Sequence, residues 1–484
     1  MRILYLDVDT LRADHLSCYG YCRETTPNLD RLAEGGTRFE NCYVSDAPCL
    51  PSRASLFTGR FGIHSGVVNH GGTSADLRLM GPERGFFHGA NHNSWISAIR
   101  DAGYHTVSVS PFAERHAAWW FYRGFREMYD TGKRGMEIAQ DVSPVALRWL
   151  TQNAKRDNWF LHVNLWDPHT PYRTPLEYGN PFEGKPFDEW LTEEQIRKDF
   201  EGYGPHCAND LYGNGPVPDG WPRIPRQITN MDDYVRWIDG YDTGIRYADE
   251  HCGMILKELE RQGVLDDTTV IMSSDHGENQ GEFNIYGDHH TSCHITARVP
   301  LIIRRPGLPG GRVDTALHYQ TDMAATVLEM IGARVPADWD GVSFAPVFRE
   351  GRQAGRETLV CGNCAWSCQR SVRWDNWILL RTYHDGLKDL PDVMLFDVAG
   401  DPHQTKNLAS ARPDLVNAGL ARLELWTADM MKRSASDVDP MWNVMREGGP
   451  FHTRNQLEPY CKRLRETGRE HHAEALMRRH GRKL

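Results

Sequence analysis

Residues 2–9 read RILYLDVD, and this stretch decides the fold class. It is a short apolar run that ends in two carboxylates, Asp7 and Asp9. A run of this kind is typical of a buried strand that delivers polar groups at its C-terminal end. We therefore expect the first strand to lie inside a sheet and to end at a functional site.

Helical and strand-like segments alternate downstream of this strand. A helix is expected to begin at Pro27, with Thr26 at its N-cap and with Gly35 and Gly36 closing it. Further strands are expected at 37–44, 105–109, 158–165, 268–274 and 299–304, and further helices at 92–102, 141–154 and 232–262. The alternation predicts the α/β class, with a large, mostly parallel sheet sandwiched by helices.

The pattern changes in the second half of the chain. Residues 170–230 are rich in Pro, Gly and aromatic residues and are expected to make a long excursion over the surface. From about residue 350, short strands at 371–381 and 393–398 and a helix near 413–431 predict a small antiparallel module.

Three units follow from these patterns. We expect a catalytic α/β domain at 1–350, a C-terminal α+β subdomain at 351–435 and a helical tail at 436–484. The end of that tail, 456–484, is basic and helix-prone. It is expected to be a solvated surface helix or, alternatively, a contact between subunits of a homo-oligomer.

The composition excludes several classes of function. The 484-residue chain has 65 acidic and 55 basic residues, and its formal charge of −10 argues against nucleic acid or an anionic membrane as a partner. No apolar run approaches the roughly 18 residues of a membrane helix. The 11 cysteines and the absence of a signal-like start predict reduced thiols and a cytoplasmic protein.

The stretch 49–60, CLPSRASLFTGR, carries the first candidate for chemistry. Cys49 is expected at the N-terminus of a helix that ends at Gly59, where free N–H groups and the helix dipole favour negative charge. Arg53 lies four positions later and projects from the same helix face. Taken alone, the stretch fits a buried capping cysteine as well as a functional one.

Residues at two strand ends could hold a cation together with Cys49. Asp9 follows the first strand, and Asp275 and His276 follow the apolar strand at 268–274. Two carboxylates and an imidazole beside a helix N-terminus predict a divalent-cation site. Calcium prefers oxygen ligands and zinc accepts sulfur, so calcium is favoured only if Cys49 is converted to an oxygen-bearing group.

These motifs resemble those of the formylglycine-dependent sulfatase family, which belongs to the alkaline-phosphatase-like superfamily. The stretch 49–60 is similar to the family signature, and the segments around Asp9 and Asp275 are similar to its two metal motifs. WDPHTPY at 166–172 resembles the middle histidine motif, and LFD at 395–397 resembles the C-terminal module. The matches keep the family order over most of the chain.

The resemblance implies a modified nucleophile, a cofactor and roles for the site residues. A formylglycine-generating enzyme converts Cys49 to formylglycine, whose hydrate attacks the sulfur of a sulfate ester. Arg53 holds the hydrate and the sulfate, and His169 protonates the leaving alcohol. One divalent metal, expected to be Ca²⁺ with Mg²⁺ or Mn²⁺ as alternatives, is held by four residues: Asp9, Cys49, Asp275 and His276.

Two positions near these motifs depart from the family pattern. Thr10 stands where many members have a second aspartate, which leaves open whether Asp7 or Thr10 joins the metal. His289 aligns with a family lysine and is expected to act in catalysis with a charge that depends on pH. Zinc binding by the His- and Cys-containing segment 287–294 is an alternative interpretation of that region.

Three further residues are expected to bind substrate. The family's usual lysine and histidine after residue 104 are absent in register, and Arg115 or His116 is expected to replace them. Asn69, downstream of the signature, and His290, beside the histidine that replaces the family lysine, complete the predicted substrate-binding set.

We expect a sulfuric ester hydrolase acting on an organic sulfate, either a carbohydrate (saccharide) or a small aryl ester. The carbohydrate expectation rests on the 15 tryptophans and on the aromatic-rich loops 117–129 and 172–221. Two alternatives stay open: a phosphonate monoester or phosphodiester hydrolase with the same nucleophile, and an unmodified glycan-binding homologue without activity.

Overall fold

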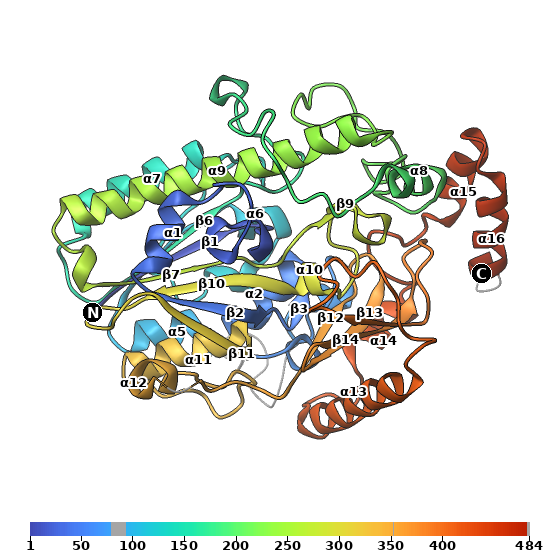
Figure 1. The fold of residues 1–484 in the computed structure, drawn as a ribbon. Coiled ribbons are helices and arrows are strands. Elements are labelled where there is room, and N and C mark those ends of the chain that lie inside the picture. The colour runs from blue at the N-terminus through green and yellow to red at the C-terminus, as the bar shows by residue number, and fades with distance from the viewer. Residues whose placement is uncertain (79–92, 352, 482–484) are drawn as a thin grey trace.

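An eight-stranded sheet forms the centre of the protein in the computed structural model, which describes residues 1–78, 93–351 and 353–481 (Figure 1). In chain order its strands are β1 (Arg2–Val8), β2 (Thr37–Tyr43), β4 (His105–Val109), β5 (Glu127–Tyr129), β6 (Trp159–Leu165), β7 (Thr268–Ser273), β10 (Arg298–Arg304) and β11 (Arg312–Tyr319). Their order across the sheet is β11-β2-β10-β7-β1-β6-β4-β5. Among these strands β10 alone runs antiparallel to its neighbours, so the predicted mostly parallel sheet is confirmed.

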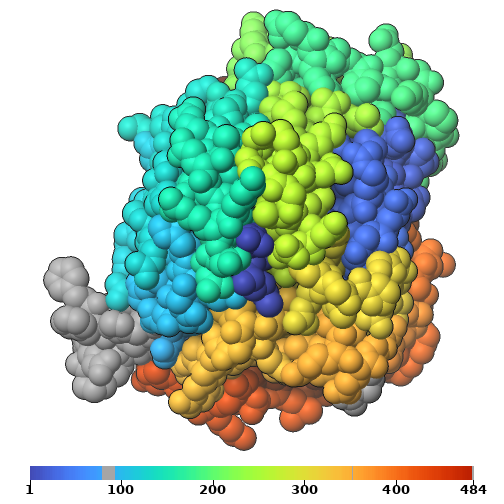
Figure 2. All heavy atoms as spheres, turned by 90° about the vertical axis from the view of Figure 1, so that its left-hand side faces the viewer, coloured from blue at the N-terminus to red at the C-terminus, as the bar shows by residue number. Residues whose placement is uncertain are grey.

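The first strand lies at the centre, as its sequence predicts. β1 pairs with β6 on one side and β7 on the other. Leu4 and Leu6 point into one core, whereas Ile3 and Tyr5 point into a second core on the opposite face. Because side chains alternate along a strand, Asp7 shares the face of Ile3 and Tyr5. Figure 2 shows the end of the molecule where the chain begins, with the first residues enclosed by later segments.

Helices cover both faces of this sheet (Figure 1). One face is covered by α1 (Pro27–Glu34), α7 (Ala139–Asn153) and α9 (Met231–Arg261), and the other by α2 (Cys49–Thr58), α5 (Trp95–Asp101) and α11 (Gln320–Met330). The helices expected from the sequence are therefore present, although residue 92 of the expected segment 92–102 lies outside the described residues. The sandwich of helices around the sheet confirms the predicted α/β class.

A second sheet packs beside the C-terminal ends of the central strands. It consists of β3 (Asp46–Ala47), β12 (Thr358–Asn363), β13 (Cys368–Trp374), β14 (Trp377–His384) and β15 (Val393–Asp397), in the order β15-β14-β13-β12-β3. The last four strands are antiparallel, which confirms the predicted small module, and α13 (Pro413–Arg433) packs on them. β3 comes from the segment just before Cys49 and pairs in parallel with β12, so the module is attached next to the start of α2.

Two strand predictions need correction. The segment 371–381, expected to be one strand, is split between β13 and β14 by a tight turn at Asp375 and Asn376. Asp375 has a φ of 43°, a left-handed conformation that Asp and Asn tolerate better than most residues. β11 was not expected at all, because this edge strand is only partly buried and has a register shift after Asp314.

Short elements lie in the connections. They are α3 (Gly62–Ser65), α6 (Phe112–His116), α8 (Glu193–Glu201), α10 (His294–Ala297), α12 (Pro346–Glu350) and α14 (Pro440–Arg446), with β8 (Asn279–Gln280) and β9 (Tyr286–Asp288) pairing as a two-stranded ribbon. The region 170–230 contains α8 and is otherwise mostly loops and turns, in agreement with the predicted excursion. None of the helices in the described part of the chain combines the length and apolar character that a membrane span requires.

The C-terminal tail differs from the single solvated helix considered above. Its end, from residue 456, folds into two helices, α15 (Leu457–Glu466) and α16 (Glu470–His480), at the opposite side of the molecule from the N-terminus (Figure 1). Its inner side is buried in one apolar cluster with the rest of the chain, made by Tyr203, Leu387, Tyr460, Leu464 and Leu476. The apolar residues of this cluster are thus covered within the chain, and an oligomer contact through the outer side of the tail stays a prediction.

Candidate active site

Three chain segments bring their functional groups to one point at the ends of the central strands. Asp9 follows β1, Asp275 and His276 follow the adjacent β7, and Cys49 begins α2. One ligand atom from each of these four buried residues lies within 4.8 Å of the others. The structure therefore brings together the four residues that the sequence predicts as metal ligands.

Arg53 lies at the centre of the carboxylates. Its Nη2 is 3.0 Å from Oδ2 of Asp7 and 3.1 Å from Oδ2 of Asp9, and its Nη1 contacts Oδ2 of Asp275. The ring of Phe112 covers the guanidinium, with its centroid 4.8 Å from Cζ. Arg53 is only 1% exposed, so its charge is held in place by these contacts rather than by water.

Asp7 and Thr10 contact other groups of the site, and a role of either as a metal ligand stays a prediction. Asp7 is bound through Oδ2 to Arg53 and to Nε2 of His162, at 3.2 Å from the latter, and so positions the guanidinium. Thr10 contributes its backbone, whose N–H donates to Oδ1 of Asp275 over 3.1 Å. Neither residue belongs to the four-residue ligand group.

The charges of this cluster do not balance. Asp7, Asp9 and Asp275 face the single guanidinium of Arg53, which leaves an excess of two negative charges when all three acids are ionised. Oδ2 of Asp9 contacts Arg53, but Oδ1 of Asp9 and Oδ1 of Asp7 have no hydrogen-bond partner among the described residues, although buried polar atoms nearly always have one. Burial, followed by the charge of Asp275, raises the pKa of Asp9 well above its usual range. A divalent cation fits both the excess charge and the orphaned oxygens.

The thiol of Cys49 is a weak nucleophile in this environment. Its Sγ lies 3.1 Å from Nε2 of His276. Burial, followed by the charge of Asp9, raises the pKa of the Cys49 thiol well above its usual range. Because the thiolate is the reactive form of cysteine, an unmodified Cys49 surrounded by these carboxylates is unsuited to attack. Nδ1 of His276 faces the carbonyl of Gly277 at 2.8 Å, which leaves Nε2 free to bind a cation.

Two further predicted catalytic histidines lie close to this cluster. His289 joins Cys49 and His276 in a second group of neighbouring ligand atoms, and its ring centroid is 4.3 Å from that of His276. His169 stacks on Trp166 and directs Nδ1 to the carbonyl oxygen of Thr170 at 2.6 Å, so Nε2 is the nitrogen available for proton transfer.

The protonation states of these two histidines qualify their predicted roles. Burial, together with the nearby Arg173, lowers the pKa of His169 to about 3. Burial, together with His276, lowers the pKa of His289 well below its usual range. Both rings are therefore neutral at pH 7 in the protein alone, and His169 can act as an acid only when a bound anion raises its pKa.

The predicted substrate-binding residues divide into two groups. His70 has its ring 5.1 Å from that of His116 and 6.4 Å from that of His289, and its backbone N–H donates to Oδ1 of Asn69. Nδ2 of Asn69 and Nε2 of His116 have no hydrogen-bond partner in the part of the chain that the structure describes. Asn69 and His116 therefore line the same side of the site, next to His70. His290 lies apart from them and stacks on Trp366.

Several residues of the site were missed from the sequence. His162 had a local signal, because it and Asn164 are the two polar residues of the mainly apolar strand β6. Trp366 and His452, whose rings stack at 4.5 Å, come from loops in the C-terminal part of the chain. No periodicity connects such loops with Cys49, so their position could not be inferred.

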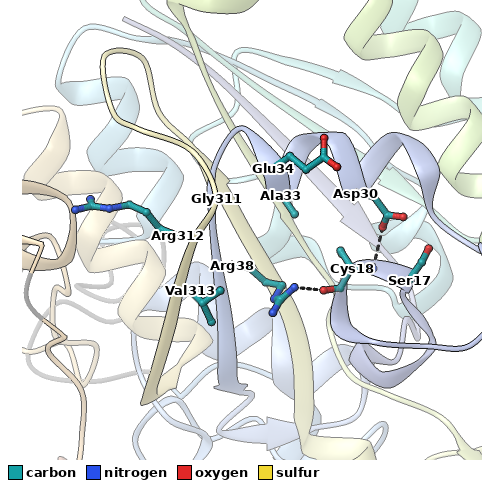
Figure 3. A pocket seen from close by; sticks show the side chains of 9 residues that line it. All are labelled: Ser17, Cys18, Asp30, Ala33, Glu34, Arg38, Gly311, Arg312 and Val313. Carbon is teal, nitrogen blue, oxygen red and sulfur yellow. Dashed lines mark hydrogen bonds between the residues drawn. The ribbon is translucent and has the colours of Figure 1, made fainter.

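The pocket in Figure 3 is separate from this site. It has a volume of about 380 Å³ and lies between α1, β2 and β11, where Cys18, Asp30 and Arg38 contribute to its lining. Burial, followed by the charge of Asp30, raises the pKa of the Cys18 thiol, so this cysteine is not reactive at neutral pH. None of the predicted site residues lines this pocket.

Comparisons with known proteins agree with the geometry. The profile of the family described as Sulfatase matches residues 2–333, and the profile described as N-sulphoglucosamine sulphohydrolase, C-terminal, matches residues 281–420. The chain belongs to the sulfatase family. The predictions of an alkaline-phosphatase-like fold and of a sulfuric ester hydrolase are thus confirmed.

Relatives of this sulfatase share most of its length. The N-acetylglucosamine-6-O-sulfatase of Bacteroides thetaiotaomicron is 24% identical over 490 residues, covering 84% of this chain and 82% of the relative. The multifunctional alkaline phosphatase superfamily protein PehA of Trinickia caryophylli is 24% identical over 476 residues, covering 84% and 91%.

Solved structures with the same fold are also found. A protein in complex with its substrate D-glucosamine-2-N,6-O-disulfate superposes with a TM-score of 0.70 at 20% identity, covering 91% of this chain and 99% of the other. The phosphonate monoester hydrolase of Agrobacterium radiobacter gives a TM-score of 0.68 at 20% identity, covering 89% and 96%. At this identity the likeness concerns the fold.

Proposed function

We propose that this sulfatase hydrolyses a sulfate ester of a carbohydrate, with Cys49 as formylglycine and with one divalent cation bound beside it. The carrying observation is the buried group of Asp9, Cys49, Asp275 and His276, with its excess negative charge and its orphaned carboxylate oxygens. A formylglycine-generating enzyme is the partner that this chemistry requires.

The modification resolves the mismatch between the thiol and the carboxylates. Conversion of Cys49 replaces sulfur by oxygen, and the donor set becomes one imidazole with oxygens. Ca²⁺ suits such a set, with Mg²⁺ and Mn²⁺ as alternatives. When bound, the cation lowers the pKa of an adjacent hydroxyl and neutralises negative charge. Asp9, Asp275 and His276 would hold it.

Arg53 would orient the nucleophile and a sulfate group. Its guanidinium is anchored by Asp7 on one side and by Asp275 on the other, so it reaches the reacting group without a change of rotamer. A fixed, permanently charged fork stabilises the charge that develops on sulfate oxygens during transfer.

His169 is the proposed donor of the proton that the leaving alcohol needs. Nδ1 is occupied by the carbonyl of Thr170, so the transferable proton would be carried at Nε2. The negative charge of a bound sulfate ester raises the low pKa that burial imposes on this ring. The same effect would operate on His289, whose neutral ring lies beside His276.

The carbohydrate substrate is supported by relatives rather than by the pocket itself. Three relatives are named N-acetylglucosamine-6-sulfatase or N-acetylglucosamine-6-O-sulfatase, and the solved structure with a TM-score of 0.70 contains a glucosamine disulfate. A 6-O-sulfated N-acetylglucosamine is therefore the substrate to test first. Phosphonate monoesters are the second candidate, because two solved structures with this fold are named phosphonate monoester hydrolases, with TM-scores of 0.68 and 0.66.

A side-by-side assay separates these candidates. Protein produced with a formylglycine-generating enzyme is assayed with N-acetylglucosamine 6-sulfate, an aryl sulfate and an aryl phosphonate monoester, and Cys49→Ala is the control. We expect at least one sulfate ester to be cleaved with a kcat/KM at least tenfold above that for the phosphonate. A reversed preference would replace the sulfatase proposal by phosphonate hydrolysis, and binding of the sugar without any turnover would support the non-catalytic alternative.

A further inference from the structure

Another group of potential metal ligands lies beside the active site. It shares no residue with the two groups around Cys49. His206 comes from the excursion at 170–230, Asp288 is the last residue of β9, and His290 follows two residues later. One ligand atom of each lies within 4.8 Å of the others. Nε2 of His206 is 3.3 Å from Oδ2 of Asp288, and Nε2 of His290 is 3.6 Å from Oδ1 of Asp288.

The imidazole of His290 is buried without a hydrogen-bond partner. The residue is 1% exposed, and neither of its ring nitrogens has a hydrogen bond in the described part of the chain. An orphaned polar ring in the interior is costly unless something binds it. Because its nitrogens lie next to a carboxylate and a second imidazole, a cation is the partner that satisfies all three groups.

We propose that His206, Asp288 and His290 bind a second divalent cation of the transition-metal type, such as Zn²⁺. Two imidazoles and one carboxylate suit such ions better than calcium, which prefers oxygen. Three protein ligands leave at least one coordination position for water or for a group of the substrate. This site does not depend on the proposed substrate.

The surroundings fix the ligands in place. Trp366 stacks on the ring of His290 with the centroids 4.1 Å apart, and it meets the ring of His206 edge-on at 5.0 Å. The carbonyl oxygen of His206 accepts a hydrogen bond from the N–H of Tyr286 over 2.9 Å, which ties the loop to β9. Such outer contacts orient metal ligands in advance of binding.

The second site and the catalytic site are neighbours. His289 lies between Asp288 and His290 in the sequence, with Nε2 3.4 Å from Oδ1 of Asp288 and its ring next to that of His276. A cation bound at Asp288 would therefore add fixed positive charge to this side of the active site. That charge acts on an anionic substrate without taking part in bond cleavage.

Lys388 is the group that competes with a cation. It is buried nearby, and burial lowers its pKa to about 8, so it is largely protonated at pH 7. Its Nζ lies 3.4 Å from the carbonyl oxygen of Asn284, and no ion pair joins it to Asp288 among the described residues. Because its ammonium repels a cation, Lys388→Met is expected to tighten metal binding.

Metal binding by the chelator-treated full chain tests the proposal. Zn²⁺ is counted by elemental analysis after gel filtration, and Co²⁺ binding is followed by its visible absorption at pH 7. His206→Asn is the test variant, because His206 has a φ of 61° and Asn tolerates that conformation. The exposed His471→Asn is the matched control. We expect His206→Asn to lose one equivalent, or to bind it at least tenfold more weakly, and the control to bind like the wild type.

Asp275→Asn separates the two sites. This variant is expected to lose the catalytic equivalent and to keep the one at His206, and circular dichroism of each variant confirms folding. If His206→Asn binds Zn²⁺ and Co²⁺ with the wild-type stoichiometry and affinity, the second site does not exist. If Lys388→Met weakens binding instead of tightening it at least threefold, the proposed competition is refuted.

Discussion

Two buried clusters in this sulfatase are each built around an arginine that is 1% exposed, and they differ in how its charge is matched. In the catalytic cluster Arg53 faces three aspartates. In the other cluster, Arg12 binds Asp14 at 2.6 Å and Glu282 at 3.0 Å. His403 adds a second cation through Nδ1, 2.9 Å from Oε1 of Glu282.

The comparison separates a structural cluster from a functional one. Burial favours protonation of Glu282, but Arg12 and His403 outweigh it and lower its pKa to about 2. Asp9 shares its one partner, Arg53, with Asp7 and Asp275, and burial followed by the charge of Asp275 raises its pKa. The buried Glu282 is matched by two cations and needs nothing more, whereas three buried acids around one cation are stabilised by binding another cation. The predictions below test this difference.

Arg53→Ala is expected to have the largest effect. Removing the guanidinium leaves three buried carboxylates without it, so stability in chelator should fall by about 3–5 kcal/mol. Turnover should fall by roughly 1,000-fold or more, because the fixed charge beside the sulfate is lost. Urea unfolding and steady-state assays measure the two effects. Arg53→Lys, which keeps the charge without the fork, should recover part of the stability and little of the turnover, and near-normal turnover of Arg53→Ala would refute the assigned role.

Glu282→Gln is expected to lower the stability of the protein, whereas Asp9→Asn is not. Asp9→Asn removes an acid whose ionisation is opposed by burial and by Asp275, so the metal-free protein should be equally stable or more stable, by about 1 kcal/mol. Its turnover should nevertheless fall by roughly 1,000-fold, because a cation ligand is lost. Glu282→Gln should cost about 2 kcal/mol and leave kcat within twofold. Urea unfolding in the presence of chelator measures the stability of both variants. A clear loss of stability in Asp9→Asn would contradict the charge imbalance.

His403→Gln is expected to destabilise the protein in a way that depends on pH. Burial opposes the charge of His403, but its hydrogen bonds to Asp188 and Glu282 outweigh burial and raise its pKa to about 9. The unfolded value is about 6.5, so this contribution of about 3 kcal/mol is fully present below pH 6.5 and is lost as pH rises through 9. The stability difference between wild type and variant should shrink between pH 6 and pH 9.5. A constant difference would show that His403 contributes only through packing.

Asp249→Asn is expected to have the smallest effect. Asp249 accepts hydrogen bonds from the N–H groups of Asn28 at 3.0 Å and Leu29 at 2.9 Å, at the start of α1. The amide keeps an acceptor oxygen but loses the charge that favours a helix N-terminus, so the cost should be about 1 kcal/mol. Thermal unfolding measures it, and turnover should stay unchanged. A loss as large as that of Glu282→Gln would mean that helix ends and ion pairs satisfy buried acids to the same degree.

The sequence was most informative where local pattern determines position. Asp9, Asp275 and His276 follow apolar strands, and Cys49 begins a helix, so their meeting point could be predicted from the α/β alternation. The capping of α1 shows the limit of such reasoning. Thr26 occupies the expected N-cap position, but its side chain makes no capping bond, and the carboxylate of Asp249 from α9 takes that role.

Residues fixed by tertiary contacts could not be placed from the sequence. His289 and His290 are neighbours in the chain, yet one lies beside His276 and the other stacks on Trp366. Consecutive side chains leave a strand end in different directions, and only the surrounding loops decide which one reaches the site. His206 is supplied by a long loop whose path has no periodic signal.

Mass spectrometry of the tryptic peptide 39–53 tests the central claim most directly. The peptide contains Cys42 and Cys49, so Cys42 is an internal control for thiol alkylation. In enzyme of measured turnover, we predict that Cys42 is alkylated and that Cys49 has lost its sulfur, with the mass of an oxygen in its place and two hydrogens fewer. A fully active preparation in which Cys49 is still an alkylatable thiol would contradict the account.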